Sequence, residues 1–306
     1  MTLWKKHELF FRPGKKIIGK WQHHRYTIKR KLGSGAVGTV FLCHIGGREV
    51  ALKISKHVSS IMTEVNVLKS LKKVQEHRLG PSLMDVDDFV IKDGTTYTFY
   101  VMEYIKGDHL RSFIRNHGTE WIGVFMLQLL DDLEKLHQRG WVLGDLKIEN
   151  LIVENNPPKL RWIDVGGTTR IGRSIKEYTE IYDRGYWGLG SRKAEPSYDL
   201  FALVIVFLSV FHEKQLTKGR DAKTTLLKKL VETKALNLYE PILKKALLGQ
   251  YPSSSLMKQD MLALLYHIQQ RRRINTNKAL WPFVLESLGI SVIAGGLYLA
   301  SIYFVP

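Results

Sequence analysis

The sequence predicts an α+β protein with two lobes, followed by one helix that is long enough to cross a membrane. Residues 26–104 have the pattern of short strands separated by turns, whereas residues 108–270 carry helical periodicity over most of their length. A β-rich part followed by an α-rich part indicates two lobes with a cleft between them. Residues 287–305 contain no charged side chain, which predicts the final helix.

The first lobe is expected to be a sheet with one helix. Alternating apolar residues predict the strands, and Gly46-Gly47 is typical of a hairpin turn. Val65, Leu68 and Leu71 fall on one face of a predicted amphipathic helix. The expected elements are strands at residues 26–32, 37–45 and 49–54, a helix at 61–74, and strands at 86–91 and 96–104.

The second lobe is expected to be helical. An apolar run at residues 201–211 is only about eleven residues long, which suits a buried helix and not a membrane span. The expected helices cover residues 121–138, 201–211, 226–231, 241–248 and 253–270.

The chain is strongly basic, with 46 Lys or Arg residues against 29 Asp or Glu residues and a formal charge of +17. Such an excess favours anionic partners, although a solvated basic surface would also explain part of it. The positive excess is uneven, with a basic N-terminal arm, residues 1–25, and a basic juxtamembrane segment, residues 271–280. The single cysteine, Cys43, excludes a disulfide framework within the chain and indicates a reducing compartment.

Residues 281–305 are expected to form a single transmembrane helix. At about 1.5 Å per residue, about 20 residues cross a hydrocarbon core of about 30 Å. The basic run before this segment predicts a cytoplasmic main domain in the cell membrane, with the C-terminus outside. Ser291 and Gly295 form a small-residue pair that could support dimerisation. Neither an N-terminal signal peptide nor an extracellular domain is expected.

The spacing of Asp145, Lys147 and Asn150 suits phosphoryl transfer onto a hydroxyl. The Asp can accept or orient the hydroxyl, the Lys can offset charge on the transferred group, and the Asn can bind a metal ion. This spacing alone occurs often by chance. A further acidic motif, Asp164-Val165-Gly166, follows fourteen residues after Asn150.

A glycine-rich loop and a lysine-bearing strand precede these motifs. Gly33, Gly35 and Gly38 lie between two predicted strands, which argues against a dinucleotide-binding fold. Glycines allow backbone N–H groups to approach phosphates, although a plain flexible hairpin has the same pattern. Lys53 on the next strand and Glu64 on the following helix could form an ion pair or remain solvated surface charges.

In this order, the motifs resemble the signature of Hanks-type, or eukaryotic-like, bacterial serine/threonine protein kinases, from about Tyr26 to Arg273. The resemblance implies a bilobal protein-kinase-like fold within residues 26–270, with an N-lobe at 26–104 and a C-lobe at 108–270. It implies ATP with Mg²⁺ or Mn²⁺ as cofactors and protein substrates. A C-terminal anchor without an extracellular domain resembles the layout of a sporulation-type kinase.

The resemblance also implies roles for individual residues. Lys53 would hold the α- and β-phosphates and Glu64 would fix Lys53, whereas Asp145 would receive the substrate hydroxyl and Lys147 would contact the γ-phosphoryl group. The implied metal ligands are Asn150 and Asp164. The implied nucleotide-binding residues are Leu32, Gly33, Gly35, Gly38, Val40, Ala51, Lys53, Met102, Glu103, Ile105 and Asp108.

Three positions depart from the family signature. Gly144 replaces an Arg that grips a phosphate on the activation loop, so activity is not expected to require loop phosphorylation acting through that position. Val165 replaces a Phe beside Asp164, and no Ala-Pro-Glu motif is recognisable before Asp199. The hydroxyl acceptors available on this loop are Thr168, Thr169, Ser174 and Thr179.

These observations favour an active, membrane-anchored kinase that autophosphorylates. Its expected regulators are homodimerisation or an anionic ligand, either membrane lipid or DNA bound through the basic segments. The lost Arg and Phe motivate an alternative, a pseudokinase scaffold that tethers partners or nucleic acid at the membrane. A small-molecule kinase of related fold is a third interpretation, which Lys147 and the long segment between Asp164 and Asp199 disfavour.

Overall fold

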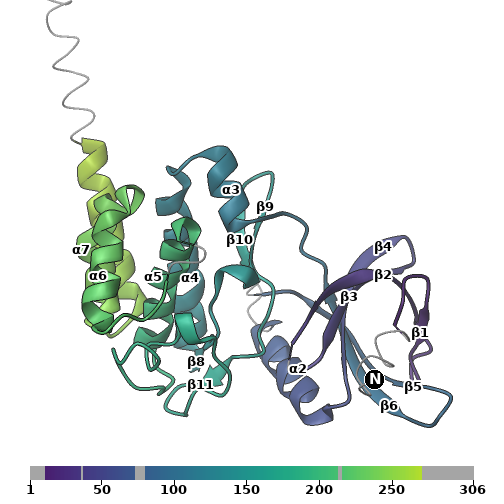
Figure 1. Ribbon diagram of the computed structural model, residues 1–306. Helices are drawn as coiled ribbons and strands as arrows, with labels where there is room; N and C mark the ends of the chain where they lie inside the picture. The colour runs from purple at the N-terminus through teal and green to yellow at the C-terminus, as the bar shows by residue number, and fades with distance from the viewer. Residues whose placement is uncertain (1–10, 36, 73–79, 213–215, 271–306) are drawn as a thin grey trace, which may run out of the picture. The chain divides into compact units, whose positions relative to one another are not determined.

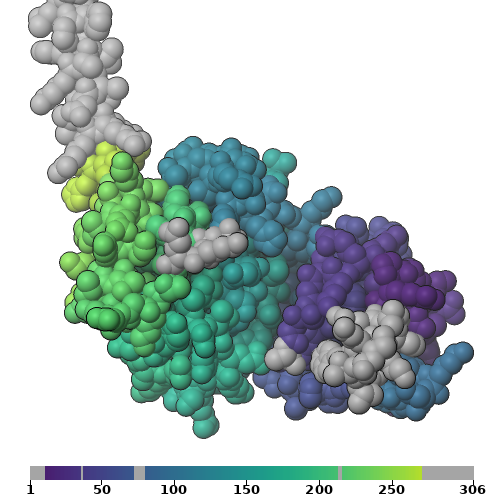
Figure 2. Space-filling model, viewed as in Figure 1, coloured from purple at the N-terminus to yellow at the C-terminus, as the bar shows by residue number. Residues whose placement is uncertain are grey.

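The computed structural model describes residues 11–35, 37–72, 80–212 and 216–270. The chain divides into two compact units, Met1–Lys258 and Gln259–Pro306, and the described part of the second unit, residues 259–270, is helical. Both lobes expected from the sequence lie mainly in the first unit. Figure 2 shows them as adjoining masses, a purple-to-blue N-lobe and a teal-to-green C-lobe.

The N-lobe is built on one antiparallel sheet with a helix against it (Figure 1). The sheet contains six strands in the order β1-β2-β3-β4-β6-β5. The elements are β1 (Lys16–Ile18), β2 (Arg25–Ser34), β3 (Thr39–Ile45), β4 (Arg48–Ser55), α2 (Val58–Lys72), β5 (Leu83–Val90) and β6 (Thr96–Glu103). The strands and the helix predicted for this lobe are confirmed, with their ends shifted by a few residues.

The two faces of this sheet have different partners, because successive side chains of a strand point to opposite faces. Leu52, Phe99 and Val101 belong to a buried apolar cluster on one face. Lys53 and Tyr100, at the alternate positions, contact Glu64 of α2 on the other face. The alternation of side chains along the strands therefore separates the core of the lobe from the face that carries Lys53.

Within the N-terminal arm that the sequence predicts, residues 16–18 add a strand to the sheet. β1 pairs with β2, and Ile17 lies opposite Tyr26. The backbone amides of Trp21 and Gln22 donate to the Asp87 carboxylate at 3.0 and 2.8 Å. The acidic β5 strand thus ties down a basic segment more than sixty residues earlier in the chain. Residues 1–10 of the predicted arm lie outside the described residues.

The C-lobe is organised around a buried helix. Its helices are α3 (Leu110–His117), α4 (Trp121–Gln138), α5 (Pro196–Phe211), α6 (Ala222–Glu232) and α7 (Glu240–Leu247), and residues 254–270 are also helical. Every residue of α5 from Ser197 to Val210 is buried. A helix that is apolar on all sides is stable only inside a protein, so the prediction of a buried helix at residues 201–211 is confirmed.

Short strands that the sequence did not predict frame the Asp145 loop. β7 (Asp108–His109), β9 (Leu151–Glu154) and β10 (Lys159–Trp162) form a small sheet, and β8 (Trp141–Val142) pairs with β11 (Thr169–Arg170). Residues 143–150 therefore run from β8 to β9 and end in the 3₁₀ turn η1 (Ile148–Asn150). Pairing at both ends fixes the loop that carries the Asp145, Lys147 and Asn150 side chains.

No helix within the described ranges is long and apolar enough to cross a membrane. The predicted basic segment, 271–280, and the predicted transmembrane helix, 281–305, lie outside those ranges.

Candidate active site

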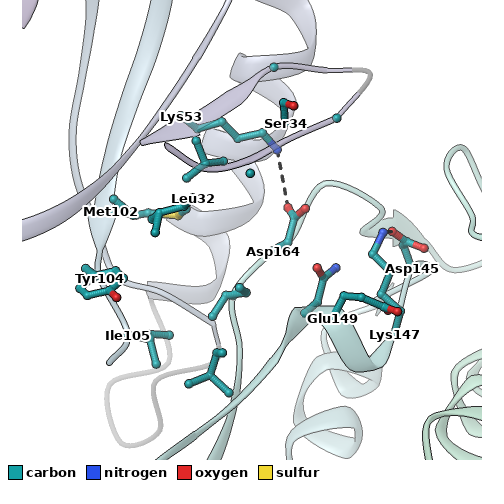
Figure 3. Close-up of a pocket in the computed structure, with 18 of the residues that line it drawn as sticks. Leu32, Ser34, Lys53, Met102, Tyr104, Ile105, Asp145, Lys147, Glu149 and Asp164 are labelled. Atoms are coloured by element: carbon teal, nitrogen blue, oxygen red, sulfur yellow. Dashed lines mark hydrogen bonds and ion pairs between the residues drawn. The ribbon is translucent and has the colours of Figure 1, made fainter. Parts of the chain in front are cut away.

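A cavity of about 630 Å³ lies between the sheet of the N-lobe and the Asp145 loop of the C-lobe. This volume is in the usual range of sites for small molecules and cofactors. Figure 3 shows Lys53 above Asp164, with Asp145 and Lys147 on the far side of the same space. The cavity wall contains, among the predicted residues, Leu32, Gly33, Gly35, Gly38, Val40, Ala51, Lys53, Met102, Glu103, Ile105, Asp145, Lys147, Asn150 and Asp164.

Lys53 is held by a buried carboxylate on α2. Its Nζ donates to Oε1 and Oε2 of Glu64 at 2.9 and 2.7 Å, which confirms the ion pair that the sequence left open. The Tyr100 hydroxyl donates to Glu64 Oε2 at 2.7 Å from β6. Burial lowers the pKa of Lys53, but Asp164 and Glu64 outweigh burial and raise it above its ordinary value. Lys53 is therefore a fixed ammonium at the cavity wall.

Asp164 presents its carboxylate to the cavity opposite Lys53. Its Oδ1 lies 3.6 Å from Lys53 Nζ and accepts the amide of Gly166 at 2.9 Å. The Asp164 side chain keeps 39% of its surface exposed, against 3% for Glu64. The two carboxylates near Lys53 thus differ: Glu64 is closed off behind it, whereas Asp164 remains open to a bound group.

The Asp145 loop brings a carboxylate, an ammonium and a hydroxyl together. Lys147 Nζ donates to Asp145 Oδ2 and, at 3.3 Å, to Oγ1 of Thr179. Thr179 in turn donates to Asp145 Oδ1 at 3.0 Å. Thr179 lies more than thirty residues further along the chain, on the segment after Asp164. Its hydroxyl therefore joins that segment directly to Asp145.

Asp199 at the start of α5 supports this loop from inside the lobe. Its carboxylate is fully buried and accepts the amides of Leu143 and Gly144 at 2.8 and 3.0 Å. His137 on α4 contacts the same carboxylate at 2.9 Å and Ser254 Oγ at 2.7 Å through its other ring nitrogen. The buried helix thus fixes the backbone immediately before Asp145.

A buried arginine braces the chain crossing between the lobes. Arg161 on β10 is 5% exposed and donates to Glu154, to the carbonyl of Gly80 and to Glu103 at 3.0, 2.9 and 3.3 Å. Glu103 also accepts the amide of Ser82 at 3.1 Å. These hydrogen bonds and the Arg161 charge lower the pKa of Glu103 against the opposing effect of burial. The backbone of Glu103 at the cavity edge is consequently held from behind.

Two buried charged residues anchor the segment that lacks an Ala-Pro-Glu motif. Asp183 is fully buried and accepts hydrogen bonds from the amides of Gly185 and Tyr186, from Arg192 Nε and from the Tyr198 hydroxyl. Arg184 donates to the Ser191 carbonyl, Ser197 Oγ and Glu195 Oε1 at 2.8, 2.7 and 2.5 Å. Both charges are therefore compensated, and the segment is pinned to the start of α5.

Asp108 is not among the residues that line the cavity, and its place in the nucleotide site stays a prediction. Its backbone pairs with Val153 in β7, and the next residue, His109, lines the cavity instead because strand neighbours face opposite sides. Glu64 lies behind Lys53, as its implied role requires.

The cavity wall also contains residues that the sequence did not single out. They are Arg30, Ser34, Val37, Tyr104, Gly107, His109, Glu149, Ile152, Ile163 and Glu177. Strand alternation around Ile152 could have identified one of them. Nothing local marks Glu177, whose pKa is raised by partial desolvation and by the charge of Glu64.

The donor set fits a nucleoside triphosphate with a divalent cation. The Lys53 ammonium can bind phosphate oxygens, and the oxygens of Asp164 and Asn150 on the same wall are the ligand type that Mg²⁺ prefers. Leu32 and Met102 supply an apolar surface at the other end of the cavity, where a planar base can pack (Figure 3), and Ala51 also lines the cavity. Charged and apolar groups are thus divided as a nucleotide requires.

The chain is similar in sequence to known protein kinases. A family model described as the protein kinase domain matches residues 26–282. The serine/threonine-protein kinase YabT of Bacillus subtilis (strain 168) is 48% identical over 263 residues, which cover 86% of this chain and 78% of that protein. The probable serine/threonine-protein kinase YbdM of the same organism is 28% identical over 271 residues, covering 83% and 93%. The sporulation protein kinase mde3 of Schizosaccharomyces pombe is 28% identical over 222 residues, covering 64% and 39%.

Proposed function

This chain belongs to the protein kinase family and is a serine/threonine kinase, and from that premise we propose that its cavity transfers the γ-phosphoryl group of ATP to protein hydroxyls through Asp145, Lys147 and Lys53. The observation that carries this assignment is that one cavity wall contains Lys53, Asp145, Lys147, Asn150 and Asp164. Membership of the family implies ATP and a divalent cation.

Lys53 and Glu64 form the phosphate-binding part of the proposed site. The Glu64 carboxylate keeps the Lys53 ammonium oriented, and Lys53 binds the α- and β-phosphates. Asp164 and Asn150 are the proposed metal ligands. A bound Mg²⁺ would neutralise charge on the β- and γ-phosphates. Asp164 suits this role because it is the more exposed of the two carboxylates beside Lys53.

Asp145 and Lys147 form the proposed transfer centre. The Asp145 carboxylate orients the attacking hydroxyl and receives its proton, while Lys147 offsets negative charge on the transferred group. The Thr179 hydroxyl donates to Asp145, and this contact supports a hydroxyl as a partner of that carboxylate. The backbones of Glu103 and Ile105 are the proposed contacts to the base.

Autophosphorylation is proposed to occur at Ser174 among the four hydroxyls of the loop. Ser174 is exposed, whereas Thr168 and Thr169 are 3% and 1% exposed. Thr179 is held by Asp145 and Lys147. An exposed hydroxyl is accessible to the active site of a second molecule without unfolding of the loop.

The proposed setting is the cytoplasmic face of the cell membrane, with residues 281–305 as the anchor and the C-terminus outside. Support comes from the uncharged C-terminal run and the basic residues before it. The same basic segments favour anionic lipid or DNA as a regulator, and homodimerisation remains the other proposed regulator. A role in sporulation is proposed from the expected layout and from the similarity to the sporulation protein kinase mde3.

The decisive experiment measures radiolabel transfer from γ-labelled ATP to casein by the full chain. Wild type is expected to transfer label, whereas Lys53→Ala and Asp145→Asn are expected to lose at least 100-fold in rate. Failure of the correctly folded wild type to transfer label would instead support the pseudokinase scaffold. Vesicle flotation with anionic lipids and DNA gel shifts at rising salt would distinguish the two anionic regulators.

A further inference from the structure

The activation segment, residues 164–195, lies next to Gly144. This residue precedes Asp145 and has no charged side chain that could hold the segment. Gly144 has φ +79°, and a Cβ placed there would lie 2.4 Å from the Gly167 carbonyl oxygen and 3.5 Å from Cδ1 of Ile175. Position 144 therefore has no side chain to bind a phosphate. The space next to it is bordered by an apolar side chain of the activation segment itself.

Ile175 is buried in a stretch that is otherwise exposed. Every other residue from Arg170 to Tyr178 is exposed, whereas Ile175 keeps only 6% of its surface. Ile175 packs in a closed cluster with three fully or almost fully buried side chains: Val142, Ala194 and Tyr198. One apolar side chain thus fastens the middle of this stretch to the body of the C-lobe.

The backbone around Ile175 pairs with residues 192–194. The Ile175 amide donates to the Arg192 carbonyl at 2.8 Å, and Ala194 donates to the Arg173 carbonyl at 2.7 Å. Ser174 forms an isolated antiparallel bridge with Lys193. Short, solvent-exposed backbone pairing contributes little net stability, so burial of Ile175 is the stronger restraint.

The cations next to Ser174 are exposed to solvent. Arg173, Lys176 and Lys193 are all exposed, and they flank or face the exposed Ser174. Ion pairs between solvent-exposed groups contribute little and are screened by salt. Among the described residues, the restraint next to Gly144 is therefore apolar packing.

The anchor leads directly to the proposed transfer centre. Four residues after Ile175, Thr179 donates to Asp145 Oδ1 at 3.0 Å and accepts from Lys147 Nζ at 3.3 Å. A segment fixed at residue 175 can swing little at residue 179. Loss of the anchor would release Thr179 from Asp145 and disturb the surface that receives the protein substrate.

We propose that Ile175 is a positioning residue, whose burial against Val142, Ala194 and Tyr198 holds the activation segment in its substrate-ready position without phosphorylation. This inference rests on the proposed function, because it requires Asp145 and Lys147 to be the transfer centre. It explains how a kinase with Gly144 before its catalytic Asp orders the segment: the fold supplies a permanent apolar anchor in place of a reversible charge pair.

The test compares Ile175→Ala with a matched variant in the full chain. Ile242 on α7 is 7% exposed, so Ile242→Ala removes the same atoms from a similarly buried site in the same lobe. We expect Ile175→Ala to lower kcat/KM for casein at least 10-fold while KM for ATP stays within twofold. Ile175→Val should recover activity to within threefold of wild type, and Ile242→Ala should retain it at the same level.

A second arm removes phosphate. Phosphatase-treated wild type and Ser174→Ala are expected to keep kcat within twofold of untreated wild type. Loss of activity in either, an unchanged kcat/KM in Ile175→Ala, or an equal loss in Ile242→Ala would overturn the inference. Absence of transfer by untreated wild type would instead refute the proposed function, so the two failures are distinguishable.

Discussion

The Tyr100 hydroxyl holds the Glu64 carboxylate from behind, and Tyr100→Phe removes only that contact. The hydroxyl donates to Glu64 Oε2 at 2.7 Å, and Tyr100 is 1% exposed. A hydrogen bond to a charged partner contributes about 1.5–3 kcal/mol, so the free energy of unfolding should fall by about that amount. If about half of the free energy of this hydrogen bond serves to orient Lys53, kcat/KM for ATP falls about 4- to 12-fold, because 1.36 kcal/mol corresponds to a tenfold change in rate.

The same substitution should move the acid limb of the pH profile. Burial raises the pKa of Glu64, whereas Lys53 and the Tyr100 hydroxyl lower it, so loss of the hydroxyl raises it further. Glu64 must be ionised to hold Lys53, and activity is therefore lost as pH falls through the pKa of Glu64. In Tyr100→Phe this loss should begin at a higher pH than in wild type.

Steady-state kinetics against ATP from pH 5 to 8, together with denaturant unfolding, provide the measurement. Tyr97→Phe is the matched control, because Tyr97 lies on the same strand within the apolar cluster of the opposite sheet face. The reasoning fails if Tyr100→Phe has the kcat/KM for ATP and the acid limb of wild type. It also fails if Tyr97→Phe shows equal changes in both quantities.

Substitutions at three further positions probe the cavity and its surroundings. Arg161→Gln leaves Glu103, Glu154 and a carbonyl without their shared buried cation, so the free energy of unfolding should fall by about 3 kcal/mol in denaturant titration; a loss below about 1 kcal/mol would contradict this role. Thr179→Val should lower kcat about 10-fold at constant KM for ATP, because one hydrogen bond to a charged group is lost, and Thr179→Ser should retain activity. Glu177→Gln removes a negative charge near Lys53 and Asp164, so KM for Mg-ATP should fall about twofold, and a rise would contradict the expectation.

The secondary structure of both lobes follows from local patterns. Alternation in β4 and the helical period of α2 are properties of a few neighbouring residues, so the sequence alone predicts that Lys53 and Glu64 lie on a strand and a helix. Their ion pair needs only eleven residues of chain. The cavity wall is predictable to the same extent, since most of its members lie in motifs with fixed spacing.

Contacts between residues far apart in the sequence are not predictable from local patterns. Tyr100 reaches Glu64 across 36 residues, Thr179 reaches Asp145 across 34, and Arg161 reaches the Gly80 carbonyl across 81. Tyr, Thr and Arg at such distances carry no periodic signal. The partners of residues 20–22 on β5, Asp87 and Asp88, are not predictable for the same reason, because they lie in a different part of the chain.

Gly144, which stands where the family signature has an Arg, lies against Gly167 of the activation segment. A Cβ on Gly167 would lie 2.6 Å from Cβ of Asp145, and a Cβ on Gly144 would meet the Gly167 carbonyl. The Asp145 loop and the activation segment therefore approach through paired glycines, and a cation at position 144 is excluded by space as well as absent. Gly144→Arg would separate these two backbones and would not restore control by a phosphate. Asp183 and Arg184 fix the other end of the activation segment through buried charges. The order of the segment therefore depends on contacts at both of its ends.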